Sequence, residues 1–319
     1  MKFSRIVGTG SYLPEKTLTN DELQDRLNTS NEWIRARTGI ETRRIANNNQ
    51  NTSDLATLAL EKALKNANLA ANDIDAIVLA TTTPDLIFPA TAVRVQRNIK
   101  MKKGFAFDVQ AVCSGFIYAL QIADSLIKAE KVQRIAVIGA ETMSRIVNWY
   151  DRSTCVLFGD GAGALILEKN ESTNQGIIDI ELFSDGEYQD MLIVNGGVSS
   201  GNFDEKVTMN GREVFRHAVT KIPESIENII QKNNINLEEL NWILLHQANQ
   251  RIIKSVMSKL NVDVNKAIST VAHHANTSAA SIPLALDEYV ITKKIKTGDL
   301  IVLSALGAGF TWGAALIKI

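Results

Sequence analysis

The chain has 319 residues, 45% of them hydrophobic, and its formal net charge at pH 7 is -1. This length supports one large or two medium cores, and the balanced charge gives no basis for charge-driven binding to nucleic acid or membranes. The two cysteines, Cys113 and Cys155, cannot form a disulfide framework and lack metal-ligand spacing, so we expect a reduced, cytoplasmic setting.

Apolar runs and helical patterns alternate along the first half, which opens in a strand-like pattern without the features of a signal peptide. The patterns predict helices at 52–68, 90–98 and 114–129, and strands at 74–80, 105–109 and 134–139. Such alternation is typical of parallel βαβ units in an α/β fold.

A glycine-rich stretch at 159–163 lies between apolar runs at 154–158 and 164–168, and we interpret it as the turn of a hairpin. It is no dinucleotide loop, because a strand pattern follows it where that loop needs a helix. Cys155, within the first of these runs, is expected in the core.

The polar stretch 170–175 is the predicted boundary between an N-terminal half, 1–170, and a C-terminal half, 171–319. The segment 185–207 is rich in glycine, acids and asparagine and is expected to be irregular, and alternation resumes at Arg212. The run 300–317 is long and uncharged enough to raise a membrane span, but its three glycines favour two strands joined by a turn.

The two halves share one layout. Cys113 follows a strand and opens a helical pattern, and Asn276 stands at the corresponding place before the apolar run 282–289. His246 ends a strand in the second half, where the first half has the strand 74–80. The repeat predicts two similar α/β units packed together, with Cys113, His246 and Asn276 at element ends that meet at one interface.

Cys113 is the candidate nucleophile. Buried cysteines are commonly inert, but a thiol at a helix start lies near the positive end of the helix dipole, which favours the thiolate. Gly115, two residues on, leaves room beside the sulfur for a substrate.

His246 and Asn276 are the candidate donors to a developing oxyanion. A neutral imidazole can donate one hydrogen bond, and an amide donates without a proton to lose, so together they suit an enolate oxygen. A Cys-His-Asn set also occurs in papain-like proteases, but the duplication and the missing local signature argue against that class. The glycine-rich turn 307–313 offers further backbone donors.

Several further motifs occur along the chain: Gly8–Pro14, Glu32–Ile34, Arg37–Ile40, Gly159–Ala164, His246–Asn249 and Asn276–Ala280. Taken together, these motifs resemble the β-ketoacyl-acyl-carrier-protein synthase III family, and the resemblance covers essentially the whole chain. The resemblance implies the thiolase fold, a five-layered αβαβα pseudo-dimer, and a homodimeric assembly.

The reaction implied by the resemblance has two stages. Cys113 takes an acyl group, most simply acetyl, from acyl-CoA, and malonyl-acyl-carrier-protein then loses CO2. His246 and Asn276 hold the thioester oxygen as the enolate forms, and the carbanion attacks the acyl-cysteine to give β-ketoacyl-carrier-protein, the first condensation of fatty-acid synthesis. The backbone N–H groups of Cys113 and Ala308 are the implied oxyanion hole, and no metal or redox cofactor is expected.

The resemblance also implies binding residues for the two substrates. Trp33 and Arg152 are expected to sandwich the CoA adenine, and the other expected CoA contacts are Arg37, Thr29, Gly211 and Asn249. The acidic carrier protein is expected to meet Arg216, Arg251, Lys259 and Gln247. Phe88 is expected to approach the acyl pocket of the partner subunit.

Two positions depart from the family pattern. Ala308 and Ala275 each stand where glycine is usual, so a methyl group is added at a turn that glycine suits. Three other functions stay open at this point. One is a condensing enzyme of a specialised pathway. A degradative thiolase is disfavoured because positions 307–313 hold no second cysteine, and a non-catalytic acyl-CoA-binding module is disfavoured by the intact triad.

Overall fold

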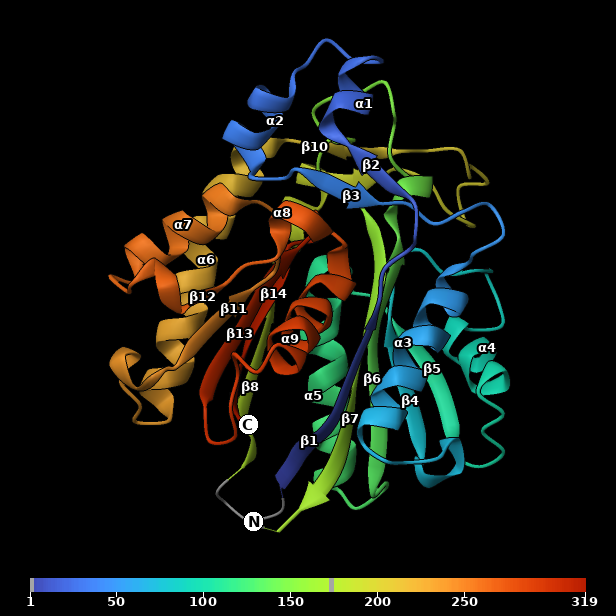
Figure 1. Cartoon of the computed structure of the whole chain (residues 1–319), viewed down its shortest axis with the longest axis vertical. Coiled ribbons are helices and arrows are strands. Elements are labelled where there is room, and N and C mark those ends of the chain that lie inside the picture. The colour runs from blue at the N-terminus through green and yellow to red at the C-terminus, as the bar shows by residue number, and fades with distance from the viewer. Residues whose placement is uncertain (1–2, 172–174) are drawn as a thin grey trace.

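The computed structural model describes residues 3–171 and 175–319, and its main body consists of two five-stranded sheets and three layers of helices (Figure 1). The first sheet has the order β1 (Phe3–Tyr12), β7 (Asp160–Asn170), β6 (Arg134–Thr142), β4 (Ala76–Ala80) and β5 (Phe105–Val109). The second has the order β8 (Gly176–Ser184), β14 (Thr311–Lys318), β13 (Leu300–Gly307), β11 (Trp242–Leu245) and β12 (Ala267–Ile268).

Strand pairing is duplicated between the sheets. In the first, β4 runs parallel to β5 and β6, and β6, β7 and β1 are successively antiparallel. In the second, β11 runs parallel to β12 and β13, and β13, β14 and β8 are successively antiparallel. The expected duplication and αβαβα layering are therefore confirmed, while residues 172–174 of the predicted boundary lie outside the described residues.

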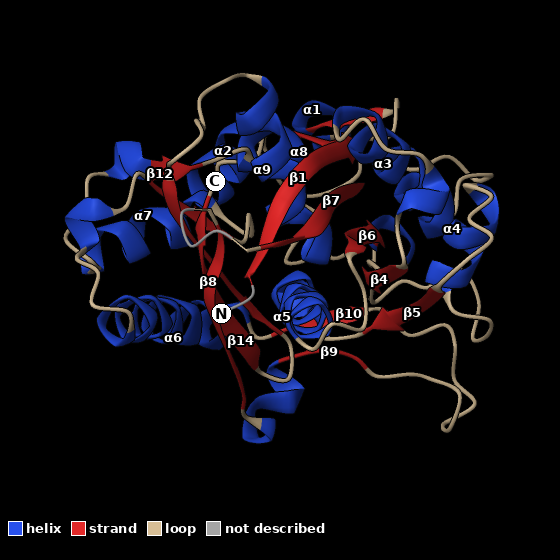
Figure 2. Ribbon diagram, turned by 90° about the horizontal axis from the view of Figure 1, so that it is seen from below, coloured by secondary structure: helices blue, strands red, loops and turns tan. Residues whose placement is uncertain are grey.

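Helices separate and cover the sheets. The outer helices are α3 (Thr52–Asn66) and α4 (Thr91–Asn98) on the first sheet, and α6 (Gly211–Lys232) and α7 (Gln250–Lys259) on the second. Between the sheets lie α5 (Gly115–Lys128) and α9 (Ser281–Ile291), and Figure 2 shows α5 end-on in this middle layer. Because β4 is covered on both faces, it reads as a continuous apolar run rather than an alternating one.

Glycines let the middle layer approach the first sheet. A Cβ on Gly139 of β6 would lie 2.3 Å from the carbonyl oxygen of Ala279, and one on Gly163 of β7 would lie 2.6 Å from the amide of Leu284. The glycine-rich stretch at 159–163 is thus largely strand, because α9 packs on it, and the predicted hairpin is wrong. Residues 154–157 form turns instead, since the Asp151 carboxylate accepts hydrogen bonds from Ser153 and Thr154, and Phe158 forms an isolated bridge with Asn276.

The segment 185–207 is more ordered than expected. It contains a 3-10 turn, η4 (Gly186–Met191), and strand β9 (Leu192–Val194), which pairs with β10 (Val207–Met209). The predicted strand–turn–strand at the C-terminal end is confirmed by β13 and β14. Among the described residues, no helix has the length and apolar character needed to cross a membrane.

A small cap at one end of the sheets was not anticipated (Figure 1, top). It comprises β2 (Thr17–Thr19), α1 (Asn20–Gln24), α2 (Asn31–Thr38) and β3 (Thr42–Arg44). Its centre is the fully buried Arg43, whose guanidinium donates to Asn20 and to the carbonyl of Val156. Short elements tied by polar groups leave little hydrophobic periodicity to detect.

Short helical segments complete the fold. These are η1 (Ala71–Asp73), η2 (Val112–Ser114), η3 (Met143–Arg145), η5 (Leu237–Glu239), η6 (Val264–Lys266), α8 (Val271–His274) and η7 (Ser278–Ala280). Two of them, η2 and η7, precede the two middle helices and carry the residues considered next.

Candidate active site

Cys113 lies in η2, between β5 and α5, and is only 4% exposed. It stands two residues before the helix, inside the protein, and burial raises the pKa of its thiol to about 12. This desolvation favours the neutral thiol and opposes the effect expected of the helix dipole, which favours the thiolate. Cys155, the other thiol, is fully buried in the core as expected.

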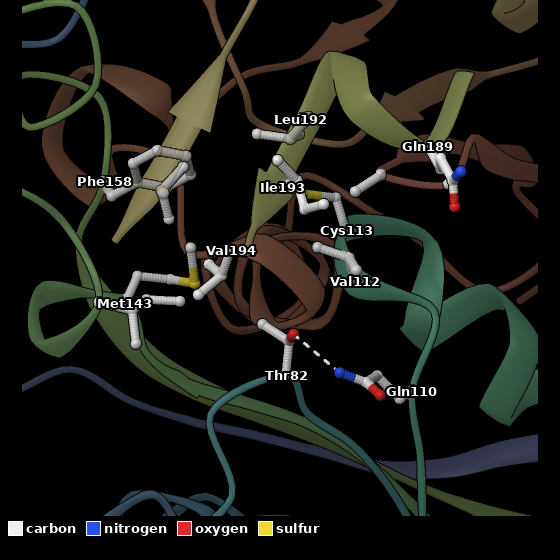
Figure 3. Close-up of a pocket in the computed structure, with 14 residues that line it drawn as sticks. Thr82, Gln110, Val112, Cys113, Met143, Phe158, Gln189, Leu192, Ile193 and Val194 are labelled. Carbon is white, nitrogen blue, oxygen red and sulfur yellow. Dashed lines mark hydrogen bonds between the residues drawn. The ribbon is translucent and has the colours of Figure 1, made fainter. Parts of the chain in front are cut away.

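Two cavities meet at Cys113. The larger, of about 330 Å³, has mainly apolar walls that include Met143, Phe158 and the strand β9 (Figure 3). The smaller, of about 100 Å³, brings Cys113 together with His246 and Asn276. The three side chains singled out from the two halves thus line one cavity, and the larger cavity offers apolar space next to the sulfur.

His246 follows β11 and is held as a neutral donor. Burial lowers the pKa of its imidazole to about 3. Its Nδ1 is 2.6 Å from the hydroxyl of Ser281, which itself accepts the Gln247 amide at 3.3 Å. We assign the hydroxyl as the donor to Nδ1, which places the imidazole proton on Nε2. Sequence reasoning missed Ser281, which follows the Asn276 motif directly in the first turn of α9.

Asn276 lies in the turn before η7. Its backbone exchanges hydrogen bonds with the segment before β7, accepting from Gly159 and donating to Leu157. Its side-chain oxygen accepts a hydrogen bond from the backbone N–H of Ser278 at 2.9 Å. This bond turns the oxygen end of the Asn276 side chain away from the cavity. The NH2 group is thereby oriented as a donor.

The two departures from the family pattern differ in cost. Ala308 does not have a positive φ, so its methyl meets no backbone strain, and it lies with Cys113 on the wall of the larger cavity. Ala275 does have a positive φ, 58°, with ψ -161°, a region that glycine favours. Strain there costs about 1–3 kcal/mol, which the buried methyl group, worth about 0.8 kcal/mol, offsets in part.

A third cavity, of about 540 Å³, opens at the surface near the triad. Five of the expected CoA contacts line it: Trp33, Arg37, Arg152, Gly211 and Asn249. The guanidinium groups of Arg37 and Arg152 stand 4.9 and 5.0 Å from the Trp33 ring centre, so all three groups already form a cationic aromatic stack. Thr29 does not line this cavity, although Arg152 donates to the carbonyl of its neighbour Asn28.

Three of the expected carrier-protein contacts are exposed. Arg216 lies on α6, and Arg251 and Lys259 lie on α7. The prediction is wrong for Gln247, which is fully buried. Its amide donates to the carbonyls of Leu245 and Ile268 and accepts from Thr270, so it ties β11 to β12 rather than meeting a partner.

Near the turn that carries Asn276, a carboxylate links two histidines. Glu288 of α9 accepts from His273 at 2.9 Å and from His274 at 3.2 Å, and these hydrogen bonds hold the pKa of Glu288 well below its usual range. The contacts fasten α8 to α9 on either side of the Asn276 turn. One potential metal-ligating atom from each of His273, His274 and Glu288 lies within 4.8 Å of the other two. The hydrogen bonds among these side chains account for the short distances.

Comparison with known proteins agrees with this geometry. Family models described as 3-oxoacyl-[acyl-carrier-protein] synthase III and its C-terminal part match residues 107–186 and 230–319. A β-ketoacyl-[acyl-carrier-protein] synthase III of Wolbachia pipientis is 53% identical over 99% of both chains. The chain belongs to this family. The enzyme of the same name from Paramagnetospirillum magneticum is 51% identical over 99% of this chain and 98% of its own.

Solved structures extend the likeness to the fold. The 3-oxoacyl-[acyl-carrier-protein] synthase III of Aquifex aeolicus is 44% identical with a TM-score of 0.95, covering 99% of this chain and all of the other. The Pseudomonas aeruginosa protein is 37% identical with a TM-score of 0.94, covering 99% and 98%. The chain is thus a thiolase-like condensing enzyme and an acyltransferase.

Proposed function

We propose that this chain joins the acyl group of an acyl-CoA, acetyl-CoA above all, to malonyl-acyl-carrier-protein through an acyl-Cys113 intermediate. The products are CoA, CO2 and β-ketoacyl-carrier-protein, the first elongation product of fatty-acid synthesis. The observation that carries the assignment of roles is the cavity shared by Cys113, His246 and Asn276.

The chemistry follows from three groups that are all uncharged. Cys113 forms the thioester, and the amides of Cys113 and Ala308 bind the oxyanion of its tetrahedral intermediate. When malonyl-carrier-protein loses CO2, Nε2–H of His246 and the NH2 group of Asn276 bind the enolate oxygen. Both donors are neutral and bind the oxygen rather than the carbanion carbon, so neither offers that carbon the labile proton of an imidazolium or a carboxylic acid, and the carbanion attacks the acyl-cysteine.

The surface cavity is assigned to CoA. Its cationic stack on Trp33 suits both an adenine ring and phosphate groups, and the ring enters by separating Arg152 from Trp33. Thr29 is retained as a contact beside this entrance. The exposed Arg216, Arg251 and Lys259 are assigned to the acidic carrier protein, whose prosthetic arm then follows the same route to Cys113.

A homodimer is proposed from the outer edge of the first sheet. Its edge strand β5 exposes Phe105, and the loop after β4 exposes Leu86, Ile87 and Phe88 at 45%, 66% and 82%. An apolar sheet edge of this kind is open to pairing with a second copy. The partner subunit's Phe88 would then close the larger cavity. We also propose that the chain divides into the halves 1–170 and 171–319 and that the enzyme acts in the cytoplasm.

The acyl preference is tested by competition. Acetyl-, isobutyryl- and octanoyl-CoA are mixed in equal amounts, and the adduct on Cys113 is read by intact mass. We expect the acetyl adduct to dominate, and Phe88→Ala to increase the share of the longer chains by opening the cavity, each buried CH2 contributing about 0.8 kcal/mol. A dominant octanoyl adduct on the unaltered enzyme would refute acetyl as the donor and leave the enzyme class unchanged.

Ser281 gives a graded test of the His246 assignment. In Ser281→Ala the imidazole loses its partner at Nδ1, so the proton is no longer fixed on Nε2. We expect normal acylation of Cys113 and about tenfold slower CO2 release from malonyl-carrier-protein. Ser281→Thr, which keeps a hydroxyl, is the matched variant and should recover most of the rate. Unchanged CO2 release in Ser281→Ala would contradict the tautomer assignment.

A further inference from the structure

Glu141, near the end of β6, is a fully buried acid that the chemistry above does not use. Its carboxylate accepts from the Thr83 hydroxyl at 2.6 Å, the Thr83 amide at 3.1 Å, the Thr82 amide at 3.1 Å and the Thr81 hydroxyl at 3.2 Å. All these donors are neutral, and burial raises the pKa of Glu141 to about 7. A carboxyl group in this state can both accept and return a proton near neutral pH.

Ser278 connects this acid with the active site. Glu141 and Gly139 point to the same face of β6, and Gly139 packs against Ala279 of η7, the residue after Ser278. The Ser278 hydroxyl lies close enough to both Cys113 and Glu141 to lower the pKa of each, while the Glu141 charge raises that of Cys113. Within the described chain this buried hydroxyl has no hydrogen bond of good geometry, so it is free to turn toward either group.

The Cys113 thiol needs a group that takes up its proton during acylation. Burial raises the pKa of Cys113 to about 12, so the neutral thiol is the favoured form at pH 7. His246 is a poor base, because burial lowers its pKa to about 3 and its Nδ1 is held by Ser281. Asn276 cannot take a proton at all. Acyl transfer therefore needs a base other than the two groups assigned to the enolate.

We infer that Ser278 and Glu141 form a proton relay that takes the Cys113 proton during acylation and returns it during condensation. As Sγ bonds to the acyl carbon, its proton passes to the Ser278 hydroxyl, and the hydroxyl's own proton passes to Glu141. The bond to the CoA sulfur breaks, and CoA leaves as a thiolate that takes a proton from solvent. When the carbanion later displaces Cys113, the thiolate recovers its proton from Glu141 through Ser278.

This relay rests on the role proposed for Cys113. Ser278 would act on the reacting sulfur itself, while Glu141 acts through it as a positioning residue. Two neighbouring elements supply further polar groups near Glu141. The loop after β4 supplies threonines, and Asp160 on the neighbouring strand β7 is engaged by the Ser144 hydroxyl and by the amides of Ser144 and Ala46.

The relay predicts a specific pH profile for acylation. Glu141 must be ionised to accept the proton, so the acylation rate should rise with pH up to about 7 and then level off. In Glu141→Gln the acceptor is gone and the rate should follow the thiol alone, climbing about tenfold per pH unit across the range 6–9. At pH 7.5 this variant should acylate at least 100-fold more slowly.

The test is single-turnover acylation by acetyl-CoA, followed by intact mass between pH 5.5 and 9. Glu141→Gln and Ser278→Ala should both lose the break near pH 7, and Glu141→Asp should keep it with a reduced rate. Asp160→Asn, which removes a buried acid on the next strand, should keep the break and its position. Thermal unfolding of each variant checks that it is folded.

The possible outcomes test the relay separately from the assignment of Cys113 as the nucleophile. A break near pH 7 that persists in folded Glu141→Gln or folded Ser278→Ala, with rates within threefold of the parent enzyme, overturns the relay. If Glu141→Gln does not fold, Ser278→Ala alone decides. Iodoacetamide alkylation of Cys113, which needs the thiolate but no acyl-CoA, should show the same loss in the variants. Normal acetylation of a Cys113→Ala variant would instead disprove the nucleophile itself.

Discussion

Cys113→Ala should take up no acetyl group from acetyl-CoA. We propose this thiol as the nucleophile because it lies where the larger cavity meets the smaller cavity shared with His246 and Asn276, and a methyl side chain has nothing to acylate. The loss of acyl transfer should be about 1,000-fold or greater. The measurement is intact mass after incubation with acetyl-CoA, followed by the rate of CoA release.

Cys155→Ala is the matched control. Cys155 is also a free, buried thiol, but it lies in the core beneath the cap and lines neither cavity. This variant should acetylate like the parent enzyme, with some loss of stability from the removed sulfur. A full acetyl adduct on Cys113→Ala, with or without one on Cys155, would refute the assignment.

Replacing His246 or Asn276 with alanine should separate the two half-reactions. Both donors are assigned to the enolate and not to the thiol, so acylation of Cys113 should continue. Release of CO2 from malonyl-carrier-protein should fall about 100- to 1,000-fold for each, the usual cost of removing one oxyanion donor. Acetylation is read by intact mass and decarboxylation by labelled CO2.

The pH dependence gives this prediction a second readout. Because burial lowers the pKa of His246 to about 3, the imidazole stays neutral throughout pH 5–9, and CO2 release by the acylated enzyme should show no histidine titration in that range. A control variant, His273→Asn, changes an exposed imidazole near the same turn and should leave both half-reactions intact. Normal CO2 release by His246→Ala or Asn276→Ala would contradict the assigned roles.

The duplicated fold could be predicted because its strands leave a strong signal. The strands covered on both faces, such as β4, are continuous apolar runs, and the helices between them keep a helical period. The glycines of β7 misled the prediction, since they are needed for contact with α9, more than 100 residues away in the chain. Glycine marks a turn and a close approach in the same way, and only the fold distinguishes them.

The site could be predicted in its members but not in its electrostatics. Spacing placed Cys113, His246 and Asn276 at equivalent element ends, and they line one cavity. Burial, which no local pattern reveals, decides that the thiol is neutral and that Gln247 ties two strands together. Ser278, Ser281 and Glu141 are ordinary residues in the sequence, and their significance comes from neighbours that the fold brings to them.

The middle layer of helices has a consequence for how the chain folds. Although α5 belongs to the first half, it packs against β8, β13 and β14 of the second, and α9 packs against β1 and β7 of the first. Each half thus keeps part of its apolar surface covered by a helix or strand of the other. We therefore expect that neither half folds on its own. The two copies of the duplicated unit should instead unfold together in one cooperative transition.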